Sequence, residues 1–227
     1  MNRNLLAWST FVAMLISIYL IFLYAPTEAT MGDVQRIFYI HVSLAWTSFL
    51  AIFILFIYSI RFLASRDRRL DIKAFCAGEV GAIFSTTVLI SGPIWAKPVW
   101  GIWWTWDARL TSAFLLWLIY MGYLVLRRLI ESPEQRARLS AVFGVLGAVD
   151  APIVYMSNRW WRTQHPAPVM GGGESSGLDP QMRLTLYVTF AACVLLFSYL
   201  WKLRCELERT QEVVESLQRA PQFKEVS

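Results

Sequence analysis

The chain has 227 residues, of which 56% are hydrophobic and 15% aromatic, whereas only 16% are charged. A soluble domain carries about 25% charged residues, so this composition excludes an ordinary soluble protein and indicates a membrane protein. The formal net charge of +5 comes mainly from basic residues that flank the apolar segments, and it does not indicate a nucleic-acid partner.

Six apolar segments follow one another along the chain. A bilayer core of about 30 Å needs roughly 20 apolar residues per spanning helix, and runs of this length exceed the strands of a membrane barrel. The first run also exceeds the 7–15-residue core of a signal peptide, so we expect it to be kept as a helix. We predict an all-α polytopic membrane protein with six transmembrane helices, at about 5–24, 38–60, 74–96, 110–130, 139–157 and 184–202.

The membrane domain is expected to span residues 1–203, followed by a polar tail at 204–227. Leu203, Leu207, Val214 and Leu217 have helical spacing, so the tail is interpreted as an extension of the sixth helix. A solvated extension is the simpler interpretation, and packing against a partner helix remains the alternative.

Lysine and arginine are distributed unevenly over the connections between the apolar segments. The termini and the even-numbered connections hold fifteen of the 21 basic residues, and the odd-numbered connections hold six. Because basic residues accumulate on the cytoplasmic side, both termini are predicted to be cytoplasmic. The connection between the third and fourth helices then lies outside.

That outer connection concentrates tryptophan in the stretch "SGPIWAKPVWGIWWTWDARLTS", which holds Trp95, Trp100, Trp103, Trp104 and Trp106. A buried tryptophan hides about 150–250 Å², so this cluster must be covered by protein, by lipid or by a flat ligand. An interfacial aromatic belt is the simplest interpretation, but it usually places fewer tryptophans in one connection. A ligand platform is therefore favoured.

The chain contains only two histidines. His41 lies at the outer end of the second helix, in "RIFYIHVSLAW", and His165 follows Trp160-Trp161 in the outer loop after the fifth helix. A neutral imidazole is a metal ligand, so the pair could bind one haem iron from opposite sides. Each histidine could instead serve an ordinary structural role.

Zinc is the competing metal, because the two histidines with Asp33 or Asp107 could form a site. A porphyrin explains more residues, since it needs an apolar platform and cations for its propionates as well as axial nitrogens. Guanidinium groups suit carboxylates best. The basic residues predicted on the outer side are Arg36, Lys97, Arg109, Arg159 and Arg162, besides Arg183.

Asp107 and Asp150 have structural interpretations. Asp107 precedes the Ala108–Leu116 run and could cap the fourth helix. Asp150 lies within the fifth apolar run beside Pro152, which is expected to kink the helix. The cysteines include no C-x-x-C-H box, so covalent haem is not expected.

The segment "WGIWWTWDARLTS" resembles the signature of the tryptophan-rich haem-handling proteins of cytochrome c maturation. The six helices, "RIFYIHV", "SGPIWAKPVWG" and the histidine after "WWRTQ" are similar to the CcmC type in particular. The similarity covers about residues 31–166 and does not extend to the tail.

The resemblance implies an inner-membrane protein that binds haem b non-covalently on its periplasmic face. It implies that His41 and His165 are the axial ligands. From their position on the outer side, Arg36, Arg109 and Arg162 are our candidates for contacts with propionates or a partner. The resemblance also implies delivery of haem to the periplasmic chaperone CcmE, with the transporter subunits CcmA and CcmB and the small protein CcmD as partners. The haem platform would be Trp100, Trp103, Trp104, Trp106 and Asp107.

No catalytic chemistry is expected of this chain itself. A cytochrome c synthase of the CcsA or CcmF sort is the nearest alternative, but those relatives have more helices and further histidines within the membrane. A haem permease is also possible, although two histidines on one side favour a receiving site. A haem protein that exchanges electrons with quinone would need a midplane histidine pair, and the sequence has none.

Overall fold

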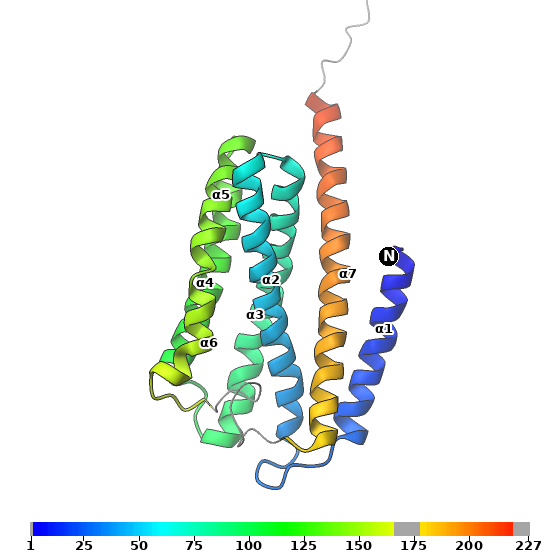
Figure 1. Cartoon of the computed structure of the whole chain (residues 1–227), viewed down its shortest axis with the longest axis vertical. Helices are drawn as coiled ribbons and strands as arrows, with labels where there is room; N and C mark the ends of the chain where they lie inside the picture. Colours follow the sequence, from blue (N-terminus) through cyan, green and yellow to red (C-terminus); the bar gives the residue numbers. More distant parts are fainter. Residues whose placement is uncertain (1, 166–177, 220–227) are drawn as a thin grey trace, which may run out of the picture.

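A computed structural model describes residues 2–165 and 178–219, and every regular element in this part of the chain is helical. The helices form an elongated bundle (Figure 1). Their bounds are α1 Arg3–Tyr19, the π-helix η1 Leu20–Tyr24, α2 Gln35–Ser65, α3 Arg68–Trp100, α4 Ala108–Leu129, α5 Pro133–Gly147, α6 Asp150–Trp160 and α7 Pro180–Arg219.

Six segments of the described chain are long and apolar enough to cross a membrane. This confirms the predicted all-α fold with six transmembrane helices. The segments are Arg3–Tyr24, Gln35–Ser65, Arg68–Trp100, Ala108–Leu129, Pro133–Trp160 and Pro180–Gln218.

The antiparallel helices α2 and α3 form the centre of the bundle, with α4, α5 and α6 on one side and α7 and α1 on the other (Figure 1). Small residues let the central helices approach closely, as is common in membrane bundles. A Cβ atom added at Gly81 of α3 would lie 2.9 Å from Cβ of Ala51 on α2 and 2.8 Å from Oη of Tyr120 on α4. Gly81 therefore permits the contact of three helices.

The fifth apolar run differs from the expected kinked helix, because it forms two helices. The chain leaves α5 after Gly147 and begins α6 at Asp150. Pro152 lies in the first turn of α6, where its missing N–H costs no helical hydrogen bond. A side chain at Gly147 would collide with Ile119 of α4. The interruption at residues 148–149 lies where Pro152 would disrupt a continuous helix, because a proline ring clashes with the carbonyl four residues earlier, here that of Ala148.

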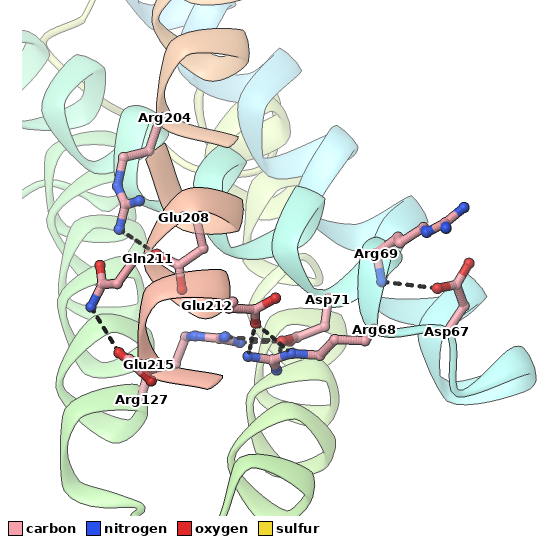
Figure 2. A network of polar contacts seen from close by, with 10 residues as sticks. All are labelled: Asp67, Arg68, Arg69, Asp71, Arg127, Arg204, Glu208, Gln211, Glu212 and Glu215. Atoms are coloured by element: carbon pink, nitrogen blue, oxygen red, sulfur yellow. Dashed lines mark hydrogen bonds and ion pairs between the residues drawn. The ribbon is translucent and has the colours of Figure 1, made fainter. Parts of the chain in front are cut away.

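The two ends of the bundle differ in chemistry. The end at which α2 and α4 begin and α3 and α6 end carries His41 and the Trp-rich segment, and we call it the histidine end. At the opposite end, Asp71 of α3 is 2% exposed and pairs with Arg127 of α4, with Nη1–Oδ1 at 2.6 Å. Arg68 connects Asp71 to Glu212 of α7 (Figure 2). These ion pairs join α3, α4 and α7.

The helix α7 has 40 residues and continues to Arg219, well past the expected end of the membrane segment near residue 203. It extends beyond the other helices at the end opposite to the histidines (Figure 1). Past its middle, α7 is fixed to α3, because Arg204 pairs with Glu79 at 2.6 Å. The stretch that carries Leu207 and Leu217 leaves both side chains more than half exposed.

Candidate functional site

The Trp-rich segment begins inside α3 and not in a loop. Pro93 and Pro98 lie within the helix, which ends at Trp100. Gly101 has a left-handed φ of 77° and its N–H donates to the carbonyl of Lys97 at 2.9 Å, which closes the helix. Nζ of Lys97 donates back to the carbonyl of Gly101 at 2.8 Å. The end of α3 is thus fixed, and five residues of non-helical chain lead from Ile102 to the cap of α4.

Asp107 is the N-cap of α4, as predicted. Its Oδ1 accepts the backbone N–H groups of Arg109 at 2.9 Å and Leu110 at 3.0 Å. Its Oδ2 accepts the hydroxyl of Thr105 at 2.9 Å and the backbone N–H of Gln164 at 3.2 Å. One carboxylate therefore holds the Trp-rich segment against the residue that precedes His165.

Arg109 makes a second connection between the same two regions. Its Nη1 donates to the carbonyl of Val154 at 2.7 Å and to Oδ1 of Asn158 at 3.1 Å. Both acceptors belong to α6, which leads into the His165 segment. Arg109 is therefore engaged within the protein, and it acts as a link between α4 and α6.

The tryptophans form two groups at the histidine end. In the first, Trp95 meets Trp100 edge-to-face at 5.2 Å between ring centroids, and Trp100 meets the ring of His165 at 6.5 Å. In the second, Trp104 meets Trp106 at 5.7 Å and Phe114 at 6.3 Å. In the first group, Trp100, a predicted platform residue, therefore contacts His165, a predicted axial ligand.

The tryptophans also differ in how far their side chains are exposed. Trp103 and Trp106 are 58% and 73% exposed, so neither is covered by the described protein. The Nε1 atoms of Trp95 and Trp104 are buried, and neither has a hydrogen-bond partner among the described residues. A buried N–H donor normally has an acceptor, so these two indole N–H groups are available to an acceptor that the described residues do not supply.

His41 lies on α2 near its beginning and is half-buried. Its Nδ1 is 2.9 Å from Oγ of Ser91 on α3. A Cβ atom added at Gly92 would lie 3.3 Å from Cε1 of His41, so the glycine leaves room for the ring. His165 contacts Trp100, which lies on the same helix as Ser91, nine residues further along. The fold therefore brings both histidines to one end of the bundle.

The three arginines predicted for propionates or a partner are in different situations. Arg36 pairs with Asp33 at 3.0 Å and donates to the backbone carbonyl of Ile21. Arg109 is engaged with α6. Arg162 is exposed. Of the three, only Arg162 forms no hydrogen bond or ion pair within residues 2–165 and 178–219.

The structure gives no support to the zinc alternative. No three His, Cys, Asp or Glu side chains of the described residues are grouped as a metal site. Asp33 is paired with Arg36, and both oxygens of Asp107 are used in capping and in holding Gln164.

Three residues of this region, Ser91, Gly92 and Asn158, were not predicted from the sequence. Each acts on a residue about 50 positions away, and a serine, a glycine or an asparagine in a helix carries no signal of such a contact. The intramembrane position of Ser91 beside a helix-end histidine becomes informative only when α2 and α3 are known to be neighbours.

Comparison with known proteins places these observations in a family. The family model "Heme exporter protein C" (CcmC) matches residues 2–220. A heme exporter protein C of Bradyrhizobium diazoefficiens is 38% identical over 214 residues, which is 94% of this chain and 81% of that protein.

Two further relatives come from distant organisms. A putative cytochrome c biosynthesis ccmC-like mitochondrial protein of Marchantia polymorpha is 34% identical over 78% of this chain and 74% of its own length. The heme exporter protein C of Escherichia coli K12 is 29% identical over 80% of this chain and 73% of its own length. With the family model matching nearly its whole length, this chain belongs to the heme exporter protein C family.

Proposed function

We propose that this protein handles haem for cytochrome c maturation, by binding haem b non-covalently at the histidine end and passing it to a periplasmic haem chaperone. The relatives carry names that refer to haem export and to cytochrome c biosynthesis. The observation that carries the proposal is that His41 and His165 each contact the outer part of α3, His41 through Ser91 and His165 through Trp100. In this role the protein has no catalytic chemistry of its own.

The residues at the histidine end fit a haem. Two imidazoles can act as axial ligands of one iron, and His41 and His165 are the candidates. The tryptophans offer apolar ring area for the porphyrin. The buried indole N–H groups of Trp95 and Trp104 suit carboxylate acceptors such as propionates, and the exposed Arg162 offers a cation.

The orientation follows from charge. The basic residues favour the cytoplasm for both termini, which supports the proposal that the histidine end faces the periplasm from a bacterial inner membrane. The exposed rings of Trp103 and Trp106 are then available at the surface where the chaperone, CcmE, receives haem. The transporter subunits CcmA and CcmB and the small protein CcmD complete the proposed assembly.

The test is the absorption spectrum of the purified full-length protein, before and after reduction. We expect b-type, six-coordinate, low-spin bands, because two imidazoles give a strong field at iron, and we expect acid–acetone to extract the haem. His41→Ala and His165→Ala should each give weak or five-coordinate binding that added imidazole partly restores.

The matched control replaces Cys76, Cys193 and Cys205 together by serine, which should leave the spectrum unchanged. A protein that neither copurified with haem nor took up added haemin would contradict the proposal. The ligand assignment alone would be wrong if both histidine variants kept the parental spectrum.

A further inference from the structure

We infer that Ser91 is a positioning residue, which holds the His41 imidazole in the tautomer and orientation that leave Nε2 free for iron. The inference rests on the proposed function. It extends that function to a residue of α3 that contacts the proposed axial ligand His41 and does not contact the haem itself. The observation behind it is the 2.9 Å contact between Oγ of Ser91 and Nδ1 of His41.

The hydrogen bonds around Ser91 favour this arrangement. Its hydroxyl lies 2.8 Å from the carbonyl oxygen of Thr87, which can accept but not donate. When the hydroxyl hydrogen is given to Thr87, the lone pairs of Oγ remain to accept a hydrogen bond from Nδ1–H of His41. A neutral imidazole that carries its hydrogen on Nδ1 has its lone pair on Nε2.

The position of the ring supports the same assignment. Gly92 lies against Cε1 of His41, where a Cβ atom would be 3.3 Å away. The ring thus rests with its Nδ1 and Cε1 atoms against α3. Within the described part of the chain, the hydrogen bond of this ring runs through Nδ1, so Nε2 is the nitrogen available to an external ligand.

The chemistry of metal ligands gives this contact its importance. A ligating histidine usually donates its other ring N–H to a nearby acceptor, which fixes the tautomer and raises the basicity of the ligand. Loss of such a partner typically weakens metal binding about 10–100-fold. A serine hydroxyl in the helix that faces His41 provides this acceptor without adding a charge to the membrane-spanning segment.

The test compares variants of the full-length protein by haemin titration, by the low-spin fraction of the ferric spectrum and by the reduction midpoint potential. Ser91→Ala should weaken haemin binding about 10–100-fold, increase the high-spin fraction, and shift the midpoint to more positive values because a less basic ligand stabilises ferric iron less. Ser91→Thr keeps the hydroxyl and should restore all three quantities.

The matched control is Thr87→Val, which removes a hydroxyl one turn earlier on the same helix. The hydroxyl of Thr87 donates to the carbonyl of Ile83 and its side chain is exposed, so this variant should behave as the parent. Parental behaviour of Ser91→Ala, with loss of the low-spin spectrum in His41→Ala, would overturn the role of Ser91 and leave the proposed function standing.

Two other results are also decisive. A loss in Ser91→Ala that Ser91→Thr does not restore would indicate packing and would overturn the hydrogen-bond role. A parental spectrum in His41→Ala would overturn the ligand assignment itself, and the role of Ser91 with it.

Discussion

Oδ2 of Asp107 accepts the backbone N–H of Gln164 at 3.2 Å, which joins two segments that lie 57 positions apart in the chain. The first segment carries the tryptophans, and the second ends in His165. The same carboxylate caps α4 through its other oxygen. One side chain at the beginning of a transmembrane helix therefore contributes directly to the spacing between the tryptophans and His165, beside the link that Arg109 makes to α6.

Asp107→Asn separates these two roles. Asparagine is an N-cap as good as aspartate, and its single carbonyl oxygen can keep the cap but cannot also accept from Gln164. We expect a nearly unchanged midpoint of thermal unfolding, faster hydrogen exchange at residues 161–165, and weaker haemin binding by up to about tenfold, since one hydrogen bond contributes about 0.5–1.5 kcal/mol.

The comparison variant is Asp107→Ala, which also loses the cap and should cost a further ~1 kcal/mol of stability. If Asp107→Asn exchanged hydrogen at the parental rate in the His165 segment, the hydrogen bond to Gln164 would have no positioning role.

Arg109 is predicted to stabilise the fold and not to bind a propionate. Arg109→Ala leaves the carbonyl of Val154 and the amide of Asn158 without this donor, so unfolding should become easier by about 1.5–3 kcal/mol. Thermal unfolding in detergent measures this loss. The ratio of the affinities for haemin and for its dimethyl ester should stay as in the parent, because the ester removes the propionate charge.

If Arg109→Ala bound haemin and its dimethyl ester with nearly equal affinity, this arginine would have to pair with a propionate. Arg162→Ala provides the contrast, because Arg162 is exposed. Its replacement should reduce the preference for haemin over the ester and leave thermal unfolding unchanged.

Trp104→Phe tests whether the tryptophans serve a ligand or the bilayer. Phenylalanine keeps much of the apolar ring area but removes the buried N–H that has no acceptor among the described residues. If this N–H meets a propionate, haemin affinity should fall about tenfold, which corresponds to ~1.4 kcal/mol for a hydrogen bond to a charged group.

The matched control is Trp106→Phe, because the ring of Trp106 is 73% exposed and its replacement should leave haemin affinity unchanged. Alanine at Trp104 should weaken haemin further, since the ring area is then lost as well. Unchanged haem occupancy and chaperone copurification across the alanine variants of Trp100, Trp103, Trp104 and Trp106 would assign these rings to the lipid interface.

The buried pair of Asp71 and Arg127 gives a prediction at the other end of the bundle. Asp71→Leu leaves the charge of Arg127 unpaired at 5% exposure, so it should destabilise the fold by about 3–5 kcal/mol. Arg127→Met should cost less, because Arg68 still pairs with Asp71. The double variant should recover much of this loss, because no unpaired charge remains. Thermal unfolding of the four proteins completes the cycle, and additive losses would contradict the pairing.

The six helices could be predicted because lipid leaves few alternatives for an apolar run of about 20 residues. The N-cap role of Asp107 could also be predicted, since a cap depends on residues two or three positions away. The bounds were harder. The third helix was expected at 74–96, but it begins at Arg68 and ends at Trp100, because hydropathy marks the apolar part of a helix and not its hydrogen-bonded ends.

Contacts between distant residues could not be predicted in this way. The need for a glycine at position 147 depends on the proximity of Ile119, and the role of Arg109 depends on acceptor groups of α6. From sequence, Arg109 was a free cation on the outer side, whereas the structure shows it engaged. Their positive charge identifies the basic residues that could bind the carboxylates of a ligand. Only the packing shows which of these residues already form bonds within the protein.

The length of α7 has a mechanical consequence. Its 40 residues form one unbroken helix about 60 Å long, at 1.5 Å per residue, roughly twice the thickness of the bilayer core. Tilting a straight helix of this length by about 5° would displace one end by about 5 Å relative to the other. Ion pairs of Arg204 and Glu212 attach α7 to α3, so a displacement of the far end of α7 would be transmitted to α3, whose other end carries the tryptophans.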